Sequence, residues 1–186
     1  MASENHDLVS VITSDHREVE QIFRALESKQ GTPEHRRDLA DHVIAELVRH
    51  SVAEEQYMYP AAREVLPDGD SVVDHELEEH AEAEQLMKDL DGLDAEDPEF
   101  DRLVTKLIAE IRHHIEEEES ELLPKLQDAC SRAQLQELGE KVVNAKKLAP
   151  TRPHPAAPDK PPANKLLGPG AGLVDRMRDA LTGRDT

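Results

Sequence analysis

Aromatic and sulfur-containing side chains are scarce in this sequence. It has no tryptophan, two tyrosines, two phenylalanines and a single cysteine, Cys130, among 186 residues. One cysteine forms no internal disulfide, which suits a reducing compartment, and it excludes an iron–sulfur cluster held by several thiolates. A core with so few aromatic residues must be built from Leu, Val, Ile, Ala and Met, which is typical of a helical bundle and not of a sheet.

The sequence also lacks a long apolar run and an excess of basic residues. No stretch of about 18 apolar residues occurs, so we expect no transmembrane segment. The first residues lack the basic and apolar regions of a signal peptide, so we expect a cytoplasmic protein. Lys and Arg number 22 against 41 Asp and Glu, giving a net charge of −19. Such a surface repels phosphates, so we expect no nucleic-acid partner.

One pattern, in contrast, occurs twice. Residues 50–60 read H-x-x-x-E-E-x-x-x-x-P, and residues 114–124 read the same. The offset of 64 residues between them also relates His16 to His80. We therefore predict an internal duplication in which each unit has a His, a second His 34 residues later, and a Glu four residues after that.

The spacing within each unit predicts a shared site. Residues i and i+4 lie on one face of a helix, so His50 presents its ring beside the Glu54 carboxylate. The second unit repeats this pair as His114 and Glu118. If each unit is an antiparallel helix hairpin, the two arms are of similar length and the second His returns to the height of the first. Four His and two Glu then converge at one level of a four-helix bundle.

Capping signals predict where the helices begin. Thr32-Pro33 and Asp97-Pro98 each place an N-cap residue before a proline at the first helical position. Apolar periodicity then predicts helices over about 7–28, from 33 to 60 or 66, over 71–90, from 98 onward, and over 131–147. The predicted fold class is all-α: an up-down-up-down four-helix bundle with an additional C-terminal helix and a Pro-rich tail.

The composition changes after residue 148, so we take residues 1–148 as the bundle with its packing helix. Residues 149–171 contain seven prolines, which predicts an extended linker because proline lacks the helix donor. Residues 172–186 predict a short amphipathic segment. Its apolar side would carry Leu173, Val174, Met177 and Leu181.

The charge changes at the same boundary. From residue 149 onward, six Lys or Arg stand against four Asp or Glu, so the tail carries +2 and the preceding residues carry −21. A lightly structured tail is one interpretation. A segment that docks a protein partner or an acidic membrane surface is the other.

Histidine and carboxylate ligands without thiolate favour two octahedral first-row metal ions. Ionised Glu54 and Glu118 on inward stripes would each cost on the order of several kcal/mol unless a cation compensates them. We expect both carboxylates to bridge two metal ions, with histidines as terminal ligands. Iron is favoured because bridged di-iron sites are common in helical bundles, and manganese and zinc stay open as alternatives.

Two further residues are candidates near this site. Glu76, one turn before the third-helix histidine, is either an additional ligand or a partly exposed glutamate near a helix start. Tyr57 is a ligand, a hydrogen-bond donor to Glu54, or an aromatic residue at the edge of the core. His75 points away from the inward stripe of its helix, and we expect His113 on the surface.

The series His, H-x-x-x-E, His, H-x-x-x-E over residues 7–129 resembles the hemerythrin family, specifically the bacterial HHE cation-binding, hemerythrin-like proteins. The resemblance implies a hemerythrin-like bundle with two non-haem iron ions (Fe2+/Fe3+), carboxylate- and oxo-bridged. It also implies the ligands of that centre, which would be His16, His50, Glu54, His80, His114 and Glu118.

The sequence departs from oxygen-carrying hemerythrins at two positions. Glu76 stands where their third helix has a second His, and Glu118 follows His114 by four residues where they have an Asp one residue later. More carboxylates and fewer nitrogens change the charge and redox potential of the centre, which disfavours reversible oxygen carriage.

Three classes of function follow. The first is a protein that binds iron and reacts with or senses O2, NO or peroxide, its small-molecule partners. The second is a di-iron enzyme with catalase-like or NO-reducing activity, and the third is a structural or interaction bundle. Anionic ligands stabilise the ferric state, which favours redox reactivity, but the sequence assigns no catalytic residue.

Overall fold

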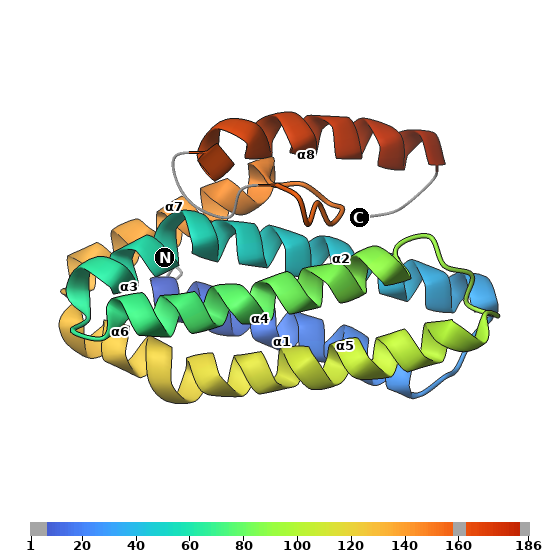
Figure 1. Cartoon of the computed structure of the whole chain (residues 1–186), viewed down its shortest axis with the longest axis horizontal. Coiled ribbons are helices and arrows are strands. Elements are labelled where there is room, and N and C mark those ends of the chain that lie inside the picture. The colour runs from blue at the N-terminus through green and yellow to red at the C-terminus, as the bar shows by residue number, and fades with distance from the viewer. Residues whose placement is uncertain (1–6, 158–162, 183–186) are drawn as a thin grey trace, which may run out of the picture.

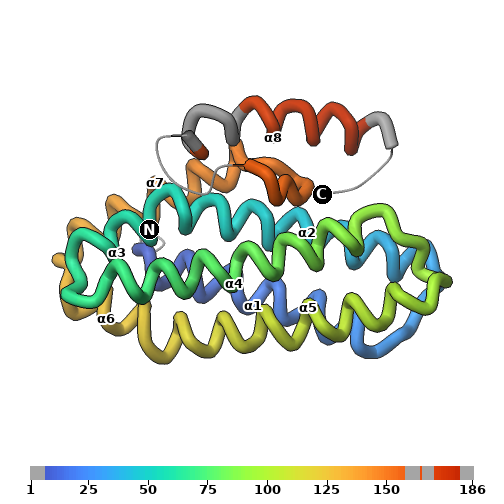
Figure 2. The backbone as a smooth tube through the Cα atoms, viewed as in Figure 1, coloured from blue at the N-terminus to red at the C-terminus, as the bar shows by residue number. Residues whose placement is uncertain are grey.

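Four antiparallel helical arms form the body of the protein (Figures 1 and 2). The computed structural model describes residues 7–157 and 163–182, which form helices, turns and short irregular segments. In chain order the helices are α1 (Leu8–Glu27), α2 (Pro33–Ala53), η1 (Glu54–Met58), α3 (Tyr59–Val65), α4 (Gly69–Leu90), α5 (Pro98–Glu117), η2 (Glu118–Leu122), α6 (Leu123–Ala129), α7 (Arg132–Leu148) and α8 (Ala163–Thr182). The arms are α1, α2–η1–α3, α4 and α5–η2–α6, so the predicted four-helix bundle is confirmed.

The predicted helix starts have the expected caps. The Thr32 side chain accepts a hydrogen bond from the backbone N–H of His35, and Pro33 is the first residue of α2. Asp97 likewise accepts from the N–H of Glu99 at the start of α5. These bonds satisfy N–H groups that a helix leaves unpaired at its first turn, which fixes where each arm begins.

The core has two apolar clusters separated by a polar layer. One cluster surrounds Phe23 and Phe100 near the loops that join the arms of each unit. The other surrounds Leu8 and Tyr59 at the opposite end. On each arm the histidine of the duplicated pattern lies between residues of the two clusters, so the bundle is apolar above and below one buried polar level.

The second and fourth arms each contain one wide turn. The N–H of Tyr59 bonds to the carbonyl of Glu54, and the N–H of Leu123 bonds to that of Glu118, which are i→i−5 bonds of a π-helix. Prolines 60 and 124 follow directly. A proline has no N–H and its ring crowds the carbonyl four residues earlier, so a wide turn accommodates it with less distortion.

Helix α7 packs on one side of the bundle, against α1, α2 and η1. A capping box at Ser131 and Gln134 starts it. Its buried residues Leu135 and Val142 join the cluster around Leu8, as the sequence led us to expect of a packing helix. Helix α7 therefore covers the first unit of the duplication.

Helix α8 begins at Ala163, so the expectation of a linker extending to residue 171 was wrong. Six of the seven prolines of this stretch precede the helix, and four of the first five helical residues, Ala163, Lys165, Leu166 and Leu167, are good helix formers. Helix α8 packs on α7 through Gly172, where a Cβ atom would lie 2.4 Å from the carbonyl oxygen of Leu148. Among the described residues, no helix has the length and apolar character needed to cross a membrane.

The predicted apolar side of α8 faces outward. Leu173, Val174 and Met177 are 57%, 63% and 60% exposed, and the side chain of Leu181 lies outside the described part. The inward side instead carries Asp175 and Asp179. Both carboxylates bond to the segment before the helix, so polar contacts attach the described side chains of α8 to the body.

Candidate metal centre

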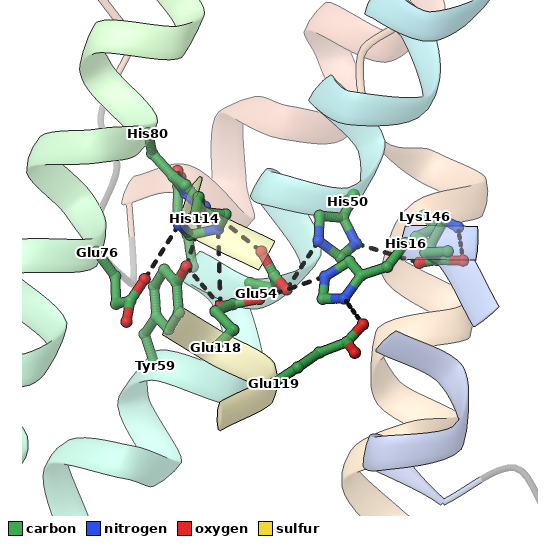
Figure 3. A network of polar contacts seen from close by, with 12 residues as sticks. His16, His50, Glu54, Tyr59, Glu76, His80, His114, Glu118, Glu119 and Lys146 are labelled. Carbon is green, nitrogen blue, oxygen red and sulfur yellow. Dashed lines mark hydrogen bonds and ion pairs between the residues drawn. The ribbon is translucent and has the colours of Figure 1, made fainter. Parts of the chain in front are cut away.

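The polar level of the bundle brings the six predicted ligand residues together (Figure 3). All six are buried, with exposed fractions between 0% and 6%. They come from all four arms and are His16, His50, Glu54, His80, His114 and Glu118.

The first half of the cluster lies between α1 and α2. The Nε2 atom of His50 is 3.0 Å from Oε1 of Glu54, and Nε2 of His16 is 3.4 Å from Oε2 of Glu118. Ligand atoms of these four residues lie within 4.8 Å of one another. Two imidazoles and two carboxylates thus surround one point.

The second half lies between α4 and α5. Nε2 of His80 is 3.4 Å from Oε2 of Glu54, and Nε2 of His114 is 3.8 Å from Oε1 of Glu118. The two rings approach each other to 3.2 Å between their Nε2 atoms. Each glutamate therefore directs one oxygen to each half, which is the arrangement of a bridging carboxylate.

A carboxylate holds the outward nitrogen of every ring. The four Nδ1···O pairs are His16–Glu119 (2.9 Å), His50–Asp15 (3.2 Å), His80–Glu55 (3.0 Å) and His114–Glu79 (2.9 Å). Such contacts fix the tautomer and the orientation of a metal-binding imidazole. The sequence analysis missed them, although the 64-residue offset relates Glu55 to Glu119 and Asp15 to Glu79.

Several inward atoms have no hydrogen-bond partner among the described residues. They are Nε2 of His16, Nε2 of His50, both carboxylate oxygens of Glu54 and Oε2 of Glu118. Leaving a buried polar atom without a partner costs about 1–3 kcal/mol, and more for a charged group. A cation at the centre would satisfy these lone pairs, so the residues present fit a metal ion.

Nearby carboxylates raise the pKa values of two histidines of the cluster, His50 and His80. Burial lowers the pKa of His50, but the negative charge of Glu54 and the bond to Asp15 outweigh it and raise that pKa to about 10. His80 is also desolvated, and its contacts with Glu54 and Glu55 raise its pKa to about 9. In the metal-free protein, protons therefore occupy the positions that a cation would take.

The structure places Tyr59, and not Tyr57, at the centre. The Tyr59 hydroxyl is 2.9 Å from Nε2 of His80 and donates to Oε1 of Glu118 at 3.2 Å. The π-turn puts residue i+5 above Glu54, whereas a regular helix favours residues i+3 and i+4. Tyr57 instead lies half-buried at the edge of the core and interacts electrostatically with Lys141 of α7.

Glu76 is buried beside the second half. It is 3% exposed, and its Oε2 atom lies 3.1 Å from Nδ1 of His114. Its ligand atoms also lie within 4.8 Å of those of His114 and Glu118. Burial and the charge of Glu118 raise the pKa of Glu76 despite the nearby His114. The position in the first unit that corresponds to Glu76 is Ile12, so this carboxylate belongs to one half only.

A cavity of about 150 Å³ adjoins the second half. It lies between α2, α4 and the segment before α8, and its lining includes His80, Glu55, Val52, Leu77, Met87, Pro150, Arg152 and His154. The cavity has room for a small molecule next to the His80 ring.

A helical bundle with a duplicated His and Glu pattern converging on one buried level defines a class of proteins whose centre could bind metal. Within that class, the chain belongs to the hemerythrin family: the Hemerythrin HHE cation binding domain matches residues 7–126. The resemblance found in the sequence is thereby confirmed.

Known proteins are similar to this chain in sequence or in fold. An uncharacterized hemerythrin-like protein of Schizosaccharomyces pombe is 28% identical over 171 residues, which cover 91% of this chain and 84% of the relative. A protein of a Nostoc strain described as a DNA nickase is 26% identical over 132 residues, covering 70% of this chain but 36% of that protein. The crystal structure of a hemerythrin HHE cation binding domain-containing protein from Mycobacterium kansasii has a TM-score of 0.65 at 21% identity, over 76% of this chain and 85% of that one.

Proposed function

We propose that the buried cluster holds two non-haem iron ions and that the protein reacts with or senses O2, NO or peroxide there. The observation that supports the proposal is the set of converging, buried ligand atoms without a hydrogen-bond partner among the described residues, above all both oxygens of Glu54 and the Nε2 atoms of His16 and His50. Ion pairs with His16, His50 and His80, at 3.0 to 3.4 Å, account for part of the burial of these carboxylates. They leave both oxygens of Glu54 and Oε2 of Glu118 without a hydrogen bond of normal geometry, which a bound cation would replace.

The two halves of the cluster would each hold one ion. His16 and His50 would serve the first half, and His80 and His114 the second. Glu54 and Glu118 would bridge them, since each has one oxygen facing each half. Nitrogen and carboxylate ligands of this kind suit iron, and the same set also accepts manganese or zinc.

The iron would supply the binding of a diatomic or peroxide ligand and one-electron redox chemistry. The protein's own groups would control access and proton supply. Burial excludes bulk water, and the outer carboxylates hold the rings in place. The cavity beside His80 provides a space from which a small ligand would reach the second half.

An enzyme of the catalase-like or NO-reducing kind is the second candidate, and Tyr59 is the observation that favours it. Burial and the charge of Glu118 raise its pKa well above the usual value, so the hydroxyl keeps its proton at neutral pH. A proton donor within 3.2 Å of a bridging carboxylate suits peroxide or NO turnover more than simple carriage.

Metal content and reactivity of the purified chain test the proposal. We expect two irons per chain in protein from iron-replete cells, and loss of two-metal loading in Glu54→Gln. Glu121→Gln is the matched control, because Glu121 lies in η2 but is exposed. Unchanged iron content in Glu54→Gln, or manganese or zinc in place of iron in the wild type, would contradict the proposal.

The same sample separates binding from catalysis. Rapid consumption of hydrogen peroxide or NO, proportional to iron content, would identify the enzyme. A visible spectrum that responds to O2, NO or peroxide without turnover would identify the binder or sensor. A chain free of transition metal with intact folding would leave the structural bundle.

A further inference from the structure

A second group of His and Glu residues lies on the surface across α4 and α5. His75 and Glu79 are four residues apart on α4, and His113 and Glu117 are four apart on α5. Both pairs therefore repeat the H-x-x-x-E spacing of the buried centre, on helix faces that point outward. The expectation that His113 lies on the surface agrees with its 62% exposed side chain.

The four side chains face one another across the two helices. Nε2 of His75 lies 3.0 Å from Oε2 of Glu117 and 3.8 Å from Oε1 of Glu79. Nε2 of His113 lies 3.5 Å from Oε1 of Glu117 and 3.7 Å from that same oxygen of Glu79. Both rings thus turn the same nitrogen toward the same two carboxylates.

Solvent reaches this group directly. The side chains of His75 and His113 are 53% and 62% exposed, while those of Glu79 and Glu117 are 19% and 34% exposed. The carboxylates are thus held partly below the surface with the imidazoles above them. The acidic body, with −21 over residues 1–148, raises the local concentration of cations.

We propose that His75, Glu79, His113 and Glu117 form a surface site for one divalent transition-metal ion. Two imidazoles and two carboxylates are a ligand set that suits zinc, cobalt or ferrous iron in four-coordinate geometry. Small rotations of exposed side chains would bring the four donors from their present contacts to a common ion. None of its four donors is a proposed ligand of the buried centre, so an ion can bind here whether or not that centre is occupied.

Glu79 links the surface site to the buried cluster. Its Oε2 atom contacts Nδ1 of His114 at 2.9 Å, while its Oε1 atom faces His75 and His113. An ion on the surface would therefore lie one carboxylate away from a ring of the buried centre. The first unit has no such site, because Val11, Arg49 and Ala53 occupy the positions equivalent to His75, His113 and Glu117.

Cobalt binding to the full-length chain tests the proposal. Co2+ would be counted by equilibrium dialysis and its coordination followed by visible absorption, in the wild type and in His75→Ala/His113→Ala. We expect the double variant to bind one Co2+ fewer per chain. Each single variant should weaken that ion at least about tenfold, the lower limit for losing even an outer partner of a metal site. His42→Ala, which removes an exposed histidine of α2, should behave as the wild type.

The same titration in a Glu54→Gln background separates the two sites. The difference of one Co2+ between His75→Ala/His113→Ala and its parent should persist there, whatever the buried cluster binds. Equal Co2+ stoichiometry and affinity with and without the two histidines would overturn the proposal. It would show that the two imidazoles contact Glu79 and Glu117 without holding an ion between them.

Discussion

The two units of the duplication have the same inner residues but different surroundings. Behind His50, the Asp15 carboxylate is covered by α7, whose Lys146 ammonium lies 2.6 Å from Oδ1. Behind His114, the equivalent Glu79 opens to the surface group around His75. Duplication thus preserves the inner ligand positions, and a single added helix makes their outer partners inequivalent.

The halves also differ in the groups that could take part in chemistry. Tyr59 and Glu76 adjoin the second half, whereas the equivalent positions of the other unit are Leu123 and Ile12. The 150 Å³ cavity likewise reaches His80. We infer that small ligands approach the second half of the cluster and that the first half changes less when they bind.

The largest expected effect comes from weakening the attachment of α8, because the segment before this helix lines the cavity beside His80. Arg152 pairs with Asp91 and Asp179 and thereby attaches α8 to α4. Arg152→Ala should lower the local stability of α8 by about 3 kcal/mol, because two largely buried carboxylates, those of Asp91 and Asp179, each lose a cationic partner. Hydrogen exchange of α8 should accelerate and azide should bind faster to the metal-loaded protein. Met177→Ala, at a position of α8 whose side chain is 60% exposed, is the control, and unchanged exchange in Arg152→Ala would refute the attachment.

The outer carboxylates allow each half to be weakened separately. Asp15→Asn should lower metal affinity about 10- to 100-fold in the first half, and Glu79→Gln by a similar factor in the second, since each removes a charged partner from the outward nitrogen of one ring. Chelator competition should then show one weak and one unchanged ion in each variant. Asp38→Asn, at an exposed position of α2, should leave both unchanged. Equal weakening of both ions by either variant would show that the halves do not load independently.

Proton release should accompany metal binding. The pKa values of His50, about 10, and His80, about 9, mean that each ring carries a proton at pH 7 until a cation displaces it. Affinity should therefore rise about tenfold per pH unit for each proton displaced, up to about pH 9. Calorimetry in buffers of different ionisation enthalpy measures the protons, and binding without release would contradict the raised pKa values.

The same values predict how pH affects the metal-free fold. Because both pKa values lie above the ordinary 6.5, the two rings stabilise the folded state fully below about pH 6.5. That contribution is lost as pH rises through about 9 for His80 and about 10 for His50. The free energy of unfolding of the metal-free protein, measured with urea between pH 6 and pH 10, should therefore decrease as the pH rises. A free energy that stays constant or increases would contradict the raised pKa values.

The smallest expected effect is that of Tyr59→Phe. Removing one buried hydrogen bond should cost about 1 kcal/mol and leave metal content unchanged. Turnover of peroxide or NO, or the spectrum of the bound ligand, should change if the hydroxyl acts on the second half. Tyr57→Phe is the matched control, since the two tyrosines lie two residues apart and Tyr57 is at the core edge. A larger effect of Tyr57→Phe would restore the expectation drawn from the sequence.

Much of the fold could be predicted from local patterns. Thr32-Pro33 and Asp97-Pro98 marked two helix starts because capping is a contact between near neighbours in the chain. The i+4 spacing likewise put His50 beside Glu54. Prediction failed for α8, where Asp175 and Asp179 face inward because they bond to Thr151 and Arg152. Those contacts join distant residues, and hydrophobic periodicity does not report them.

The sequence by itself determined the duplicated bundle and the six inward residues, because a repeated spacing on helices dictates which side chains share a face. Only the tertiary structure decided which tyrosine reaches the centre, since the π-turn at Glu54 shifts the register by one residue. Tertiary packing also decided that α7 covers Asp15 and leaves Glu79 beside His75 and His113 at the surface. The reason is physical: helix periodicity fixes the face of each residue within an arm, whereas partners on other arms depend on how the whole chain packs.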